Sequence, residues 1–162
     1  MVSIKPIRTL LAENPFFAGL SDDQFETMSG CGTIVHFKAG AFLLREGGAA
    51  DTFYLIRNGV VAIESSSPAG GPLSVARVGA GGIAGYSWLF PPYRNAFDAL
   101  AISHVSAVAL DGACLRGKAE ADHELGYQLM KRFAQVMLDR LQATRRQMLD
   151  VYGNVRTTDD TG

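Results

Sequence analysis

Residues 81–101 read GGIAGYSWLFPPYRNAFDALA and combine glycines, a short apolar segment, a diproline and one cation. The apolar segment, Ser87–Phe90, has the length of a single helical turn. Pro91-Pro92 ends that turn, because proline lacks the N–H and restricts the residue before it. Backbone amides at the start of a short helix, followed by the guanidinium of Arg94, favour the binding of a phosphate. The alternative is a loop between two strands with a surface arginine, and the flanking sequence has to decide between them.

The flanking sequence from Thr33 to Leu110 consists of short apolar runs separated by glycine. Asn58-Gly59, between two of these runs, is the strongest short hairpin signal in the chain. Many short strands at spacings of about 8–12 residues predict a small antiparallel β-barrel or jelly roll (a double-stranded β-helix). The expected strands cover residues 34–37, 42–44, 52–57, 60–65, 73–78, 99–103 and 105–110, with a mobile hairpin tip at 65–72.

Helical patterns flank the strands, so the predicted class is α+β. Pro6–Glu13 reads as a short amphipathic helix, and Ser21 with Gln24 three residues later forms a capping box for another. After Asp111 the pattern is helical again, and Asp122 is placed to cap a long helix over residues 123–152. We therefore expect one domain over residues 1–153, with the barrel at 33–110, and a polar, disordered tail at 154–162.

The long helix carries two apolar stripes. One follows a heptad spacing and predicts pairing with a second copy of the chain; it contains Met130, Ala134, Met137, Leu141, Thr144, Met148 and Val151. The other is expected to pack on the barrel and contains Leu125, Leu129, Phe133 and Val136. The basic residues are assigned to the solvated side, because acidic residues are interspersed with them; they are Lys131, Arg132, Arg140, Arg145 and Arg146.

Composition narrows the classes of function. The chain has 162 residues, enough for one domain with a core. Its formal charge of −1 provides no general attraction to nucleic acid or anionic membranes. Cys31 and Cys114 are the two cysteines, and without a CxxC spacing they argue against a disulfide framework or a zinc site. No apolar run has the length of a signal peptide or membrane span, so we expect a cytoplasmic protein.

Over about residues 14–152 the chain resembles the cyclic-nucleotide-binding domain superfamily, the sensor module of regulators of the catabolite-activator type. The segment NPFFAGLS at 14–21 matches the entry segment of the family, and Gly85 begins its phosphate-binding cassette. Arg94 lies where the phosphate arginine is expected. The family pattern of glycines and strand residues is matched by Gly40, Leu43, Glu46, Gly47, Asp51, Tyr54, Ile56 and Gly59. The glycines at 40, 47 and 59 fall at strand reversals, where a positive φ is least costly for glycine.

The cassette departs from the family pattern. Tyr86 stands where the family has a glutamate that accepts the ribose 2′-OH. Residues 95–98, Asn-Ala-Phe-Asp, replace the small residues that follow the arginine in the family, and the spacing from the arginine to Ala101 is one residue longer. Asp98 beside an incoming phosphate would repel it unless it pairs with Arg94. The stretch SWLFPPYR is similar to a cassette variant of stand-alone bacterial members.

The resemblance implies a non-catalytic regulatory domain in signal transduction. It would bind a small phosphate-containing ligand, such as cAMP, cGMP or a related nucleotide, in the barrel pocket. The helix at 127–152 would relay that binding within a homodimer. The implied ligand-binding residues are Gly82, Ala84, Gly85, Tyr86, Ser87, Arg94 and Asn95. Because the chain ends before a winged helix-turn-helix, no DNA binding is expected, and no membrane channel either.

Two alternatives stay open. One is a pseudo-sensor whose pocket is closed by its own Tyr86, Trp88 and Phe97 and which serves as an accessory or interaction subunit for a protein partner. In this case Trp88 plugs the barrel, whereas in a sensor it could stack on a base. The other is a metal-dependent barrel enzyme, which would need His36 and His104 on facing strands. Scattered histidines and the absence of a nucleophile elbow or Walker loop argue against an enzyme.

Overall fold

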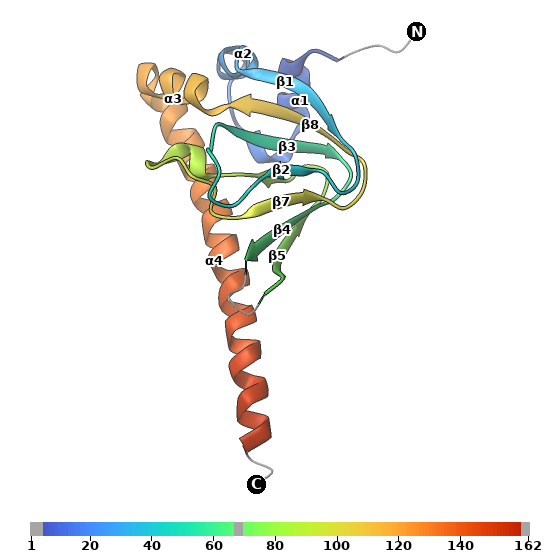
Figure 1. Cartoon of the computed structure of the whole chain (residues 1–162). Helices are drawn as coiled ribbons and strands as arrows, with labels where there is room; N and C mark the ends of the chain where they lie inside the picture. The colour runs from blue at the N-terminus through green and yellow to red at the C-terminus, as the bar shows by residue number, and fades with distance from the viewer. Residues whose placement is uncertain (1–4, 67–69, 160–162) are drawn as a thin grey trace.

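Two four-stranded antiparallel sheets face each other in the structure, a computed structural model that describes residues 5–66 and 70–159, with side chains to residue 151 (Figure 1). The first sheet has the order β1 (Gly32–Phe37), β8 (Val105–Asp111), β3 (Thr52–Asn58) and β6 (Ile83–Ala84). The second has the order β2 (Phe42–Leu44), β7 (Asp98–Ala101), β4 (Val61–Ser66) and β5 (Pro72–Val78). The predicted α+β fold with a small antiparallel β-roll is therefore confirmed.

The central strands of the first sheet, β3 and β8, are largely buried on both faces. In β3, Phe53 and Leu55 pack against the helices, whereas Tyr54 and Ile56 face the second sheet. This alternation follows from the two-residue period of a strand. Because both faces meet apolar neighbours, the strand reads as a nearly continuous apolar run. The molecule thus has three layers: helices, first sheet and second sheet.

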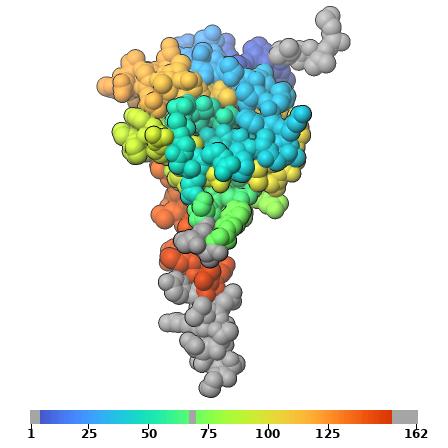
Figure 2. Space-filling view, viewed as in Figure 1, coloured from blue at the N-terminus to red at the C-terminus, as the bar shows by residue number. Residues whose placement is uncertain are grey.

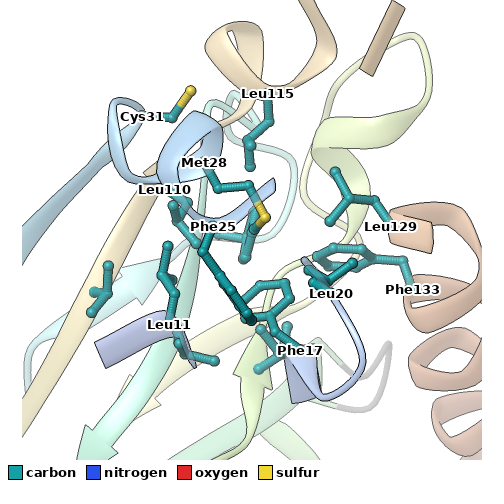
Figure 3. Close-up of a cluster of buried hydrophobic side chains, with 14 of the residues drawn as sticks. Leu11, Phe17, Leu20, Phe25, Met28, Cys31, Leu110, Leu115, Leu129 and Phe133 are labelled. Carbon is teal, nitrogen blue, oxygen red and sulfur yellow. The ribbon is translucent and has the colours of Figure 1, made fainter. Parts of the chain in front are cut away.

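The helical layer consists of α1 (Ile7–Glu13), the 3₁₀ turn η1 (Pro15–Phe17), α2 (Asp22–Ser29), α3 (Gly112–Ala121) and the first turns of α4 (His123–Asp159). Figure 3 shows Phe17, Leu129 and Phe133 converging in this layer. The predicted capping box of α2 is present, with Ser21 N and Gln24 N each donating to the side chain of the other residue. Asp122 Oδ1 likewise accepts from the first amides of α4, as predicted.

The prediction of a hairpin at Asn58-Gly59 is wrong. β3 and β4 flank this dipeptide but belong to different sheets, so the turn carries the chain across the roll. Gly59 has φ of 93°, and a Cβ on it would lie 2.2 Å from the carbonyl oxygen of His104. The dipeptide therefore reports a tight turn that requires glycine. The turn alone does not determine that β3 and β4 pair; β3 pairs with β8 and β6, and β4 pairs with β7 and β5. A true hairpin joins β4 to β5, with residues 67–69 of the predicted tip outside the described residues.

The structure continues α4 through Asp159, beyond the predicted end at 152. Residues 154–159, predicted as a tail, are helical, because extending an existing helix costs much less than starting one. Residues 160–162 lie outside the described residues. The lower part of α4 runs clear of the β-roll (Figure 1), and Figure 2 shows the coloured part of the helix emerging beneath the roll.

The two predicted stripes of α4 lie in different surroundings. Leu125, Leu129 and Phe133 are buried in the helical layer. Most of the heptad stripe is exposed, with Met137 half-buried. The assignment of all five basic residues to the solvated side is wrong for two of them. Arg132 Nε donates to Phe16 O at 2.9 Å and Arg140 Nη2 to Ile83 O at 3.1 Å, because both lie on the inner side of the helix.

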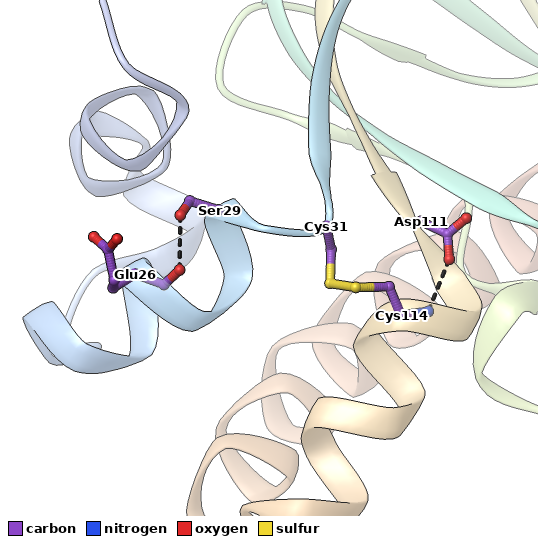
Figure 4. The surroundings of a disulfide bond; sticks show 5 residues. All are labelled: Glu26, Ser29, Cys31, Asp111 and Cys114. Carbon is purple, nitrogen blue, oxygen red and sulfur yellow. Dashed lines mark hydrogen bonds between the residues drawn. A yellow bond between two sulfur atoms is a disulfide. The ribbon is translucent and has the colours of Figure 1, made fainter.

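The cysteines form a disulfide, which corrects the expectation from their spacing (Figure 4). Cys31 precedes β1, and Cys114 lies in the first turn of α3. They are 83 positions apart in sequence, with Cα atoms 5.6 Å apart. The pairing of β1 with β8 brings them together, since β8 runs directly into α3. The spacing of two cysteines along the sequence does not reveal a contact that depends on which strands pair.

Candidate functional site

The segment between β6 and β7 forms a loop over the β-roll, and we call residues 85–97 the cassette. Gly85 opens it with φ of 101°. A Cβ there would lie 3.0 Å from Leu44 Cδ1 and 3.4 Å from Thr52 O, so backbone conformation and close packing both require glycine. The single helical turn expected next is present as the 3₁₀ turn η2 (Ser87–Leu89).

A small pocket of about 20 Å³ lies beneath the cassette. This space suits a single water molecule. The pocket is bounded by the cassette, by strands of the second sheet and by α4. The residues that line it are Leu44, Ile63, Gly85, Tyr86, Ser87, Asn95, Ala96, Phe97, Asp98, Ala99 and Arg140.

The predicted ligand-binding residues divide into two groups. Gly85, Tyr86, Ser87 and Asn95 line the pocket; Gly82, Ala84 and Arg94 do not. Gly82 has a backbone role, since its N–H donates to Gly79 O and its carbonyl accepts from Ile56 N. Ala84 is fully buried in the core between the sheets.

Arg94 is exposed, contrary to the expectation of an inward guanidinium. Its neighbour Asn95 is 8% exposed and points inward instead. Asn95 Nδ2 donates to Arg45 O at 3.1 Å and Ala49 O at 3.4 Å, and its backbone bonds to Gly47 and Gly48. The cassette is thus tied to the turn between β2 and β3 through Asn95. Asn95 therefore points into the protein at the place where the sequence analysis expected Arg94.

Asp98 is committed to a partner other than Arg94. Its side chain is 14% exposed, and Oδ1 accepts from Glu46 N at 2.6 Å. Arg45 Nε lies 3.6 Å from the same oxygen. The carboxylate is therefore stabilised from the β2–β3 turn. It also gives the pocket wall a negative group.

Aromatic rings close the pocket. The rings of Tyr86 and Phe97 are 6.3 Å apart between centroids and meet edge to face at 74°. Burial raises the pKa of the Tyr86 phenol above its usual value, while the nearby charge of Arg140 opposes the shift. Trp88 does not plug the roll. It is 1% exposed and stacks on Phe53 in the helical layer, outside the roll interior.

Arg140 is the pocket residue that the sequence analysis missed. It comes from α4 and is the one cation among the lining residues. Burial lowers the pKa of its guanidinium, and Tyr86 and Asp139 oppose that effect. It lies seven positions after Phe133, which is helical spacing on the buried side. This spacing could have identified Arg140 from the sequence, because a charged residue that continues a buried helical stripe faces the protein interior.

Histidines supply no metal centre in the described part of the chain. His36 and His104 do meet, with ring centroids 5.7 Å apart, but both are exposed. No group of three or more potential ligands occurs among the described residues. A search of the same residues for a helix long and apolar enough to cross a membrane finds none.

Comparison with known proteins matches the cyclic nucleotide-binding domain to residues 34–122, more than half of the chain. No protein of curated function matches the sequence. The crystal structure of a putative cyclic nucleotide-binding protein from Geobacter metallireducens is similar with 32% identity and a TM-score of 0.73. That alignment covers 86% of this chain and 99% of the other.

Two more distant structures share the fold. A cyclic nucleotide-binding domain from Methylobacillus flagellatus is 21% identical with a TM-score of 0.74, covering 90% of this chain and 82% of the other. The regulatory subunit of a cAMP-independent protein kinase A from Trypanosoma brucei is 23% identical with a TM-score of 0.66, covering 78% and 45%. With the family match, the Geobacter relative and the β-roll agreeing, the chain belongs to the cyclic nucleotide-binding domain family.

Proposed function

We propose that this chain is a non-catalytic regulatory domain that binds a small phosphate-containing ligand under the cassette and relays its presence through α4. The observation that carries the proposal is the position of Arg140, because one residue belongs both to the pocket wall and to the long helix. The ligand class is a cyclic nucleotide, such as cAMP or cGMP, or a related phosphate compound. The amides of Gly85–Ser87 would contact it, and Asn95 would hold the cassette over it, since its Nδ2 already donates to Arg45 O and Ala49 O.

Electrostatics support an anionic ligand. Arg140 is half-buried, and none of the ion pairs among the described residues includes it. Its guanidinium is partly desolvated, Asp139 offsets only part of that cost, and an entering phosphate would offset more of it, although Asp98 in the same pocket wall opposes an anion. Tyr86 and Phe97 must turn aside to admit a nucleotide, since the closed pocket has room for about one water molecule.

The relay requires α4 to have two positions, and a homodimer provides them. The exposed heptad stripe would pair with the same stripe of a second copy. Arg140 moving toward a ligand would shift the helix and with it the packing of that seam. A net charge near zero accords with a small-molecule partner and with no role for DNA or membrane, and a cytoplasmic location is part of the proposal.

The test is thermal unfolding of the purified chain with cAMP, cGMP and cyclic dinucleotides. A true ligand at a hundred times its Kd should raise Tm by about 5–10 °C. Arg140→Gln should abolish the increase. Arg94→Gln is the matched control, because Arg94 is an exposed arginine of the cassette, and it should leave the increase intact. Loss of the increase with Arg94→Gln alone would restore the original assignment of Arg94.

A second function, an accessory or interaction subunit with a permanently closed pocket, is favoured by the Tyr86–Phe97 contact and by Asp98 in the pocket wall. Tyr86→Ala together with Phe97→Ala distinguishes the two. If the parent chain and this opened variant both fail to respond to every nucleotide, the accessory role is the better account. A response of the parent chain supports the sensor. A response of the opened variant alone shows that Tyr86 and Phe97 keep the pocket closed in the parent chain, which favours the accessory role.

A further inference from the structure

The Cys31–Cys114 disulfide clamps the start of α3 to the end of a strand ladder (Figure 4). Cys31 lies between α2 and β1, and its carbonyl accepts from Asp111 N at 2.9 Å. The N–H of Cys114, in the first turn of α3, donates to Asp111 Oδ1 at 2.7 Å. The two sulfurs therefore join α3 to the point where β1 and β8 end.

The first two turns of α3 also hold the cassette. A Cβ on Gly112 would lie 2.9 Å from Trp88 Cβ, so the helix start packs closely on η2. Arg116, one turn later, donates from Nη1 to the Trp88 carbonyl. Its guanidinium carbon lies 4.1 Å from the ring centroid of Tyr93, a cation–π contact. A displacement of this part of α3 would therefore reach two positions in the cassette.

Tyr93 is the part of the cassette that most needs this support. It is a non-glycine residue with φ of 55°, a backbone region that L-residues seldom occupy. Such a conformation persists only where the surroundings determine it. Its carbonyl accepts from Ala50 N at 2.8 Å, and Arg116 holds its ring. Arg94 and Asn95 follow directly, so the end of the cassette depends on the same contacts.

The cysteines have the access that a reversible bond needs. Cys31 is 7% exposed, whereas Cys114 is half-buried and so the more open to attack. They are the two cysteines of the chain, so no third thiol competes. Disulfides persist in oxidising compartments, and in reducing ones they are mostly transient and redox-sensing.

We propose that Cys31–Cys114 is a thiol–disulfide switch of the cassette, opened by a dithiol reductant. A thiolate of the reductant attacks Cys114 Sγ, the S–S bond breaks, and Cys31 leaves as a thiolate and takes a proton. The second thiolate of the reductant then attacks its own sulfur in the mixed disulfide, and Cys114 leaves and is protonated. Two electrons have passed to the protein and the reductant ends as a disulfide. Release of the α3 start loosens the hold of Arg116 on Trp88 and Tyr93, whether or not a ligand binds.

The experiment uses the full chain in mixtures of reduced and oxidised dithiothreitol without denaturant. Alkylation and mass measurement count the free thiols at each ratio. Trp88 is the single tryptophan, so intrinsic fluorescence reports its surroundings. We expect the bond to open reversibly, the emission to shift to the red, and amide exchange of residues 86–97 to accelerate about tenfold. Reoxidation should restore both signals.

Variants distinguish the effect of the Cys31–Cys114 disulfide from the effect of the Arg116 contacts with the cassette. Cys31→Ser with Cys114→Ser should show the reduced signals and ignore the reductant; if this variant does not fold, the reduced parent chain carries the test. Arg116→Gln should give rapid cassette exchange with the disulfide intact. Lys118→Gln, on the exposed side of the same helix, is the matched control and should change neither signal. A bond that opens only after denaturant is added, or that opens with fluorescence and exchange unchanged, would overturn the proposal.

Discussion

The part of α4 before Arg140 and the part after it carry similar apolar side chains in opposite surroundings. Leu129, near its start, is 1% exposed and packs among the helices and first sheet. Leu141, three turns later, is 65% exposed. The residue type and the helix are the same, and only the second lacks an element of the same chain opposite it. An apolar stripe in the sequence therefore indicates a helix face that favours burial. Whether another element of the same chain buries that face depends on the tertiary structure.

The two parts of the helix meet near Arg140. Before Arg140, the helix completes the core of the domain. After it, Ala143 still packs against the second sheet and Gln147 Nε2 donates to Ser74 O of β5, and beyond these contacts the helix runs clear of the roll (Figure 1). Arg140 itself donates to Ile83 O and faces the pocket. A helix that is structural at one end, charged toward a pocket in the middle and apolar but exposed at the other is suited to carry a signal between site and partner.

Replacing one leucine in each part of the helix by alanine is the sharpest test of the contrast between buried and exposed side chains. Leu129→Ala should lower the free energy of unfolding by about 2–5 kcal/mol, because it removes buried methyl groups and leaves a cavity. Leu141→Ala should change the unfolding of the isolated monomer by less than about 0.5 kcal/mol. Urea denaturation at dilute protein concentration measures both. Equal losses at the two sites would refute the distinction.

Charges on the exposed stripe test whether a second copy covers it. Leu141→Glu with Met148→Glu should weaken self-association about 100-fold, since like charges would face each other in an apolar seam. Circular dichroism should remain that of the folded domain. Sedimentation velocity over a concentration series gives the association constant. Gln142→Glu adds a charge beside the stripe and serves as the control. If the parent chain is monomeric at all concentrations, the homodimer is abandoned.

Substitution at the junction should have an intermediate effect. Arg140→Gln removes the bond to Ile83 O and should lower the free energy of unfolding by about 0.5–1.5 kcal/mol. Arg145→Gln, on the exposed side of the helix, should have no measurable effect. Chemical denaturation compares the two. Identical stabilities would mean that Arg140 contributes nothing to the fold in the absence of ligand.

The smallest effect concerns pH. Burial raises the pKa of Tyr86, so above the ordinary tyrosine pKa of 10.0 the folded chain keeps a proton that the unfolded chain loses. Stability is therefore unaffected below about pH 10 and declines as the pH rises through the folded pKa. Tyr86→Phe should flatten part of the decline measured by urea midpoints between pH 9 and 11. Burial also raises the pKa of Tyr54, so the remainder should persist.

Features that depend on neighbours in the chain were predictable from the sequence. The caps at Ser21 and Asp122 form because a side-chain oxygen lies two or three residues from amides that need a partner. The strands and the buried stripe of α4 follow from apolar periods of two and of about 3.6 residues. Gly85 and the turn after it were also visible, since the glycine and diproline restrict the backbone directly.

Tertiary structure alone decided the features that join distant segments. The Asn58-Gly59 turn leads to another sheet, Cys31 meets Cys114, and Arg140 instead of Arg94 lines the pocket. Each depends on which strands and helices pack together, a choice set by burial over the whole chain and not by the residue types at the site. Local backbone chemistry therefore specified the helices, the strands and the glycine and turn that open the cassette. The packing of the two sheets and the long helix specified which distant residues contact the cassette.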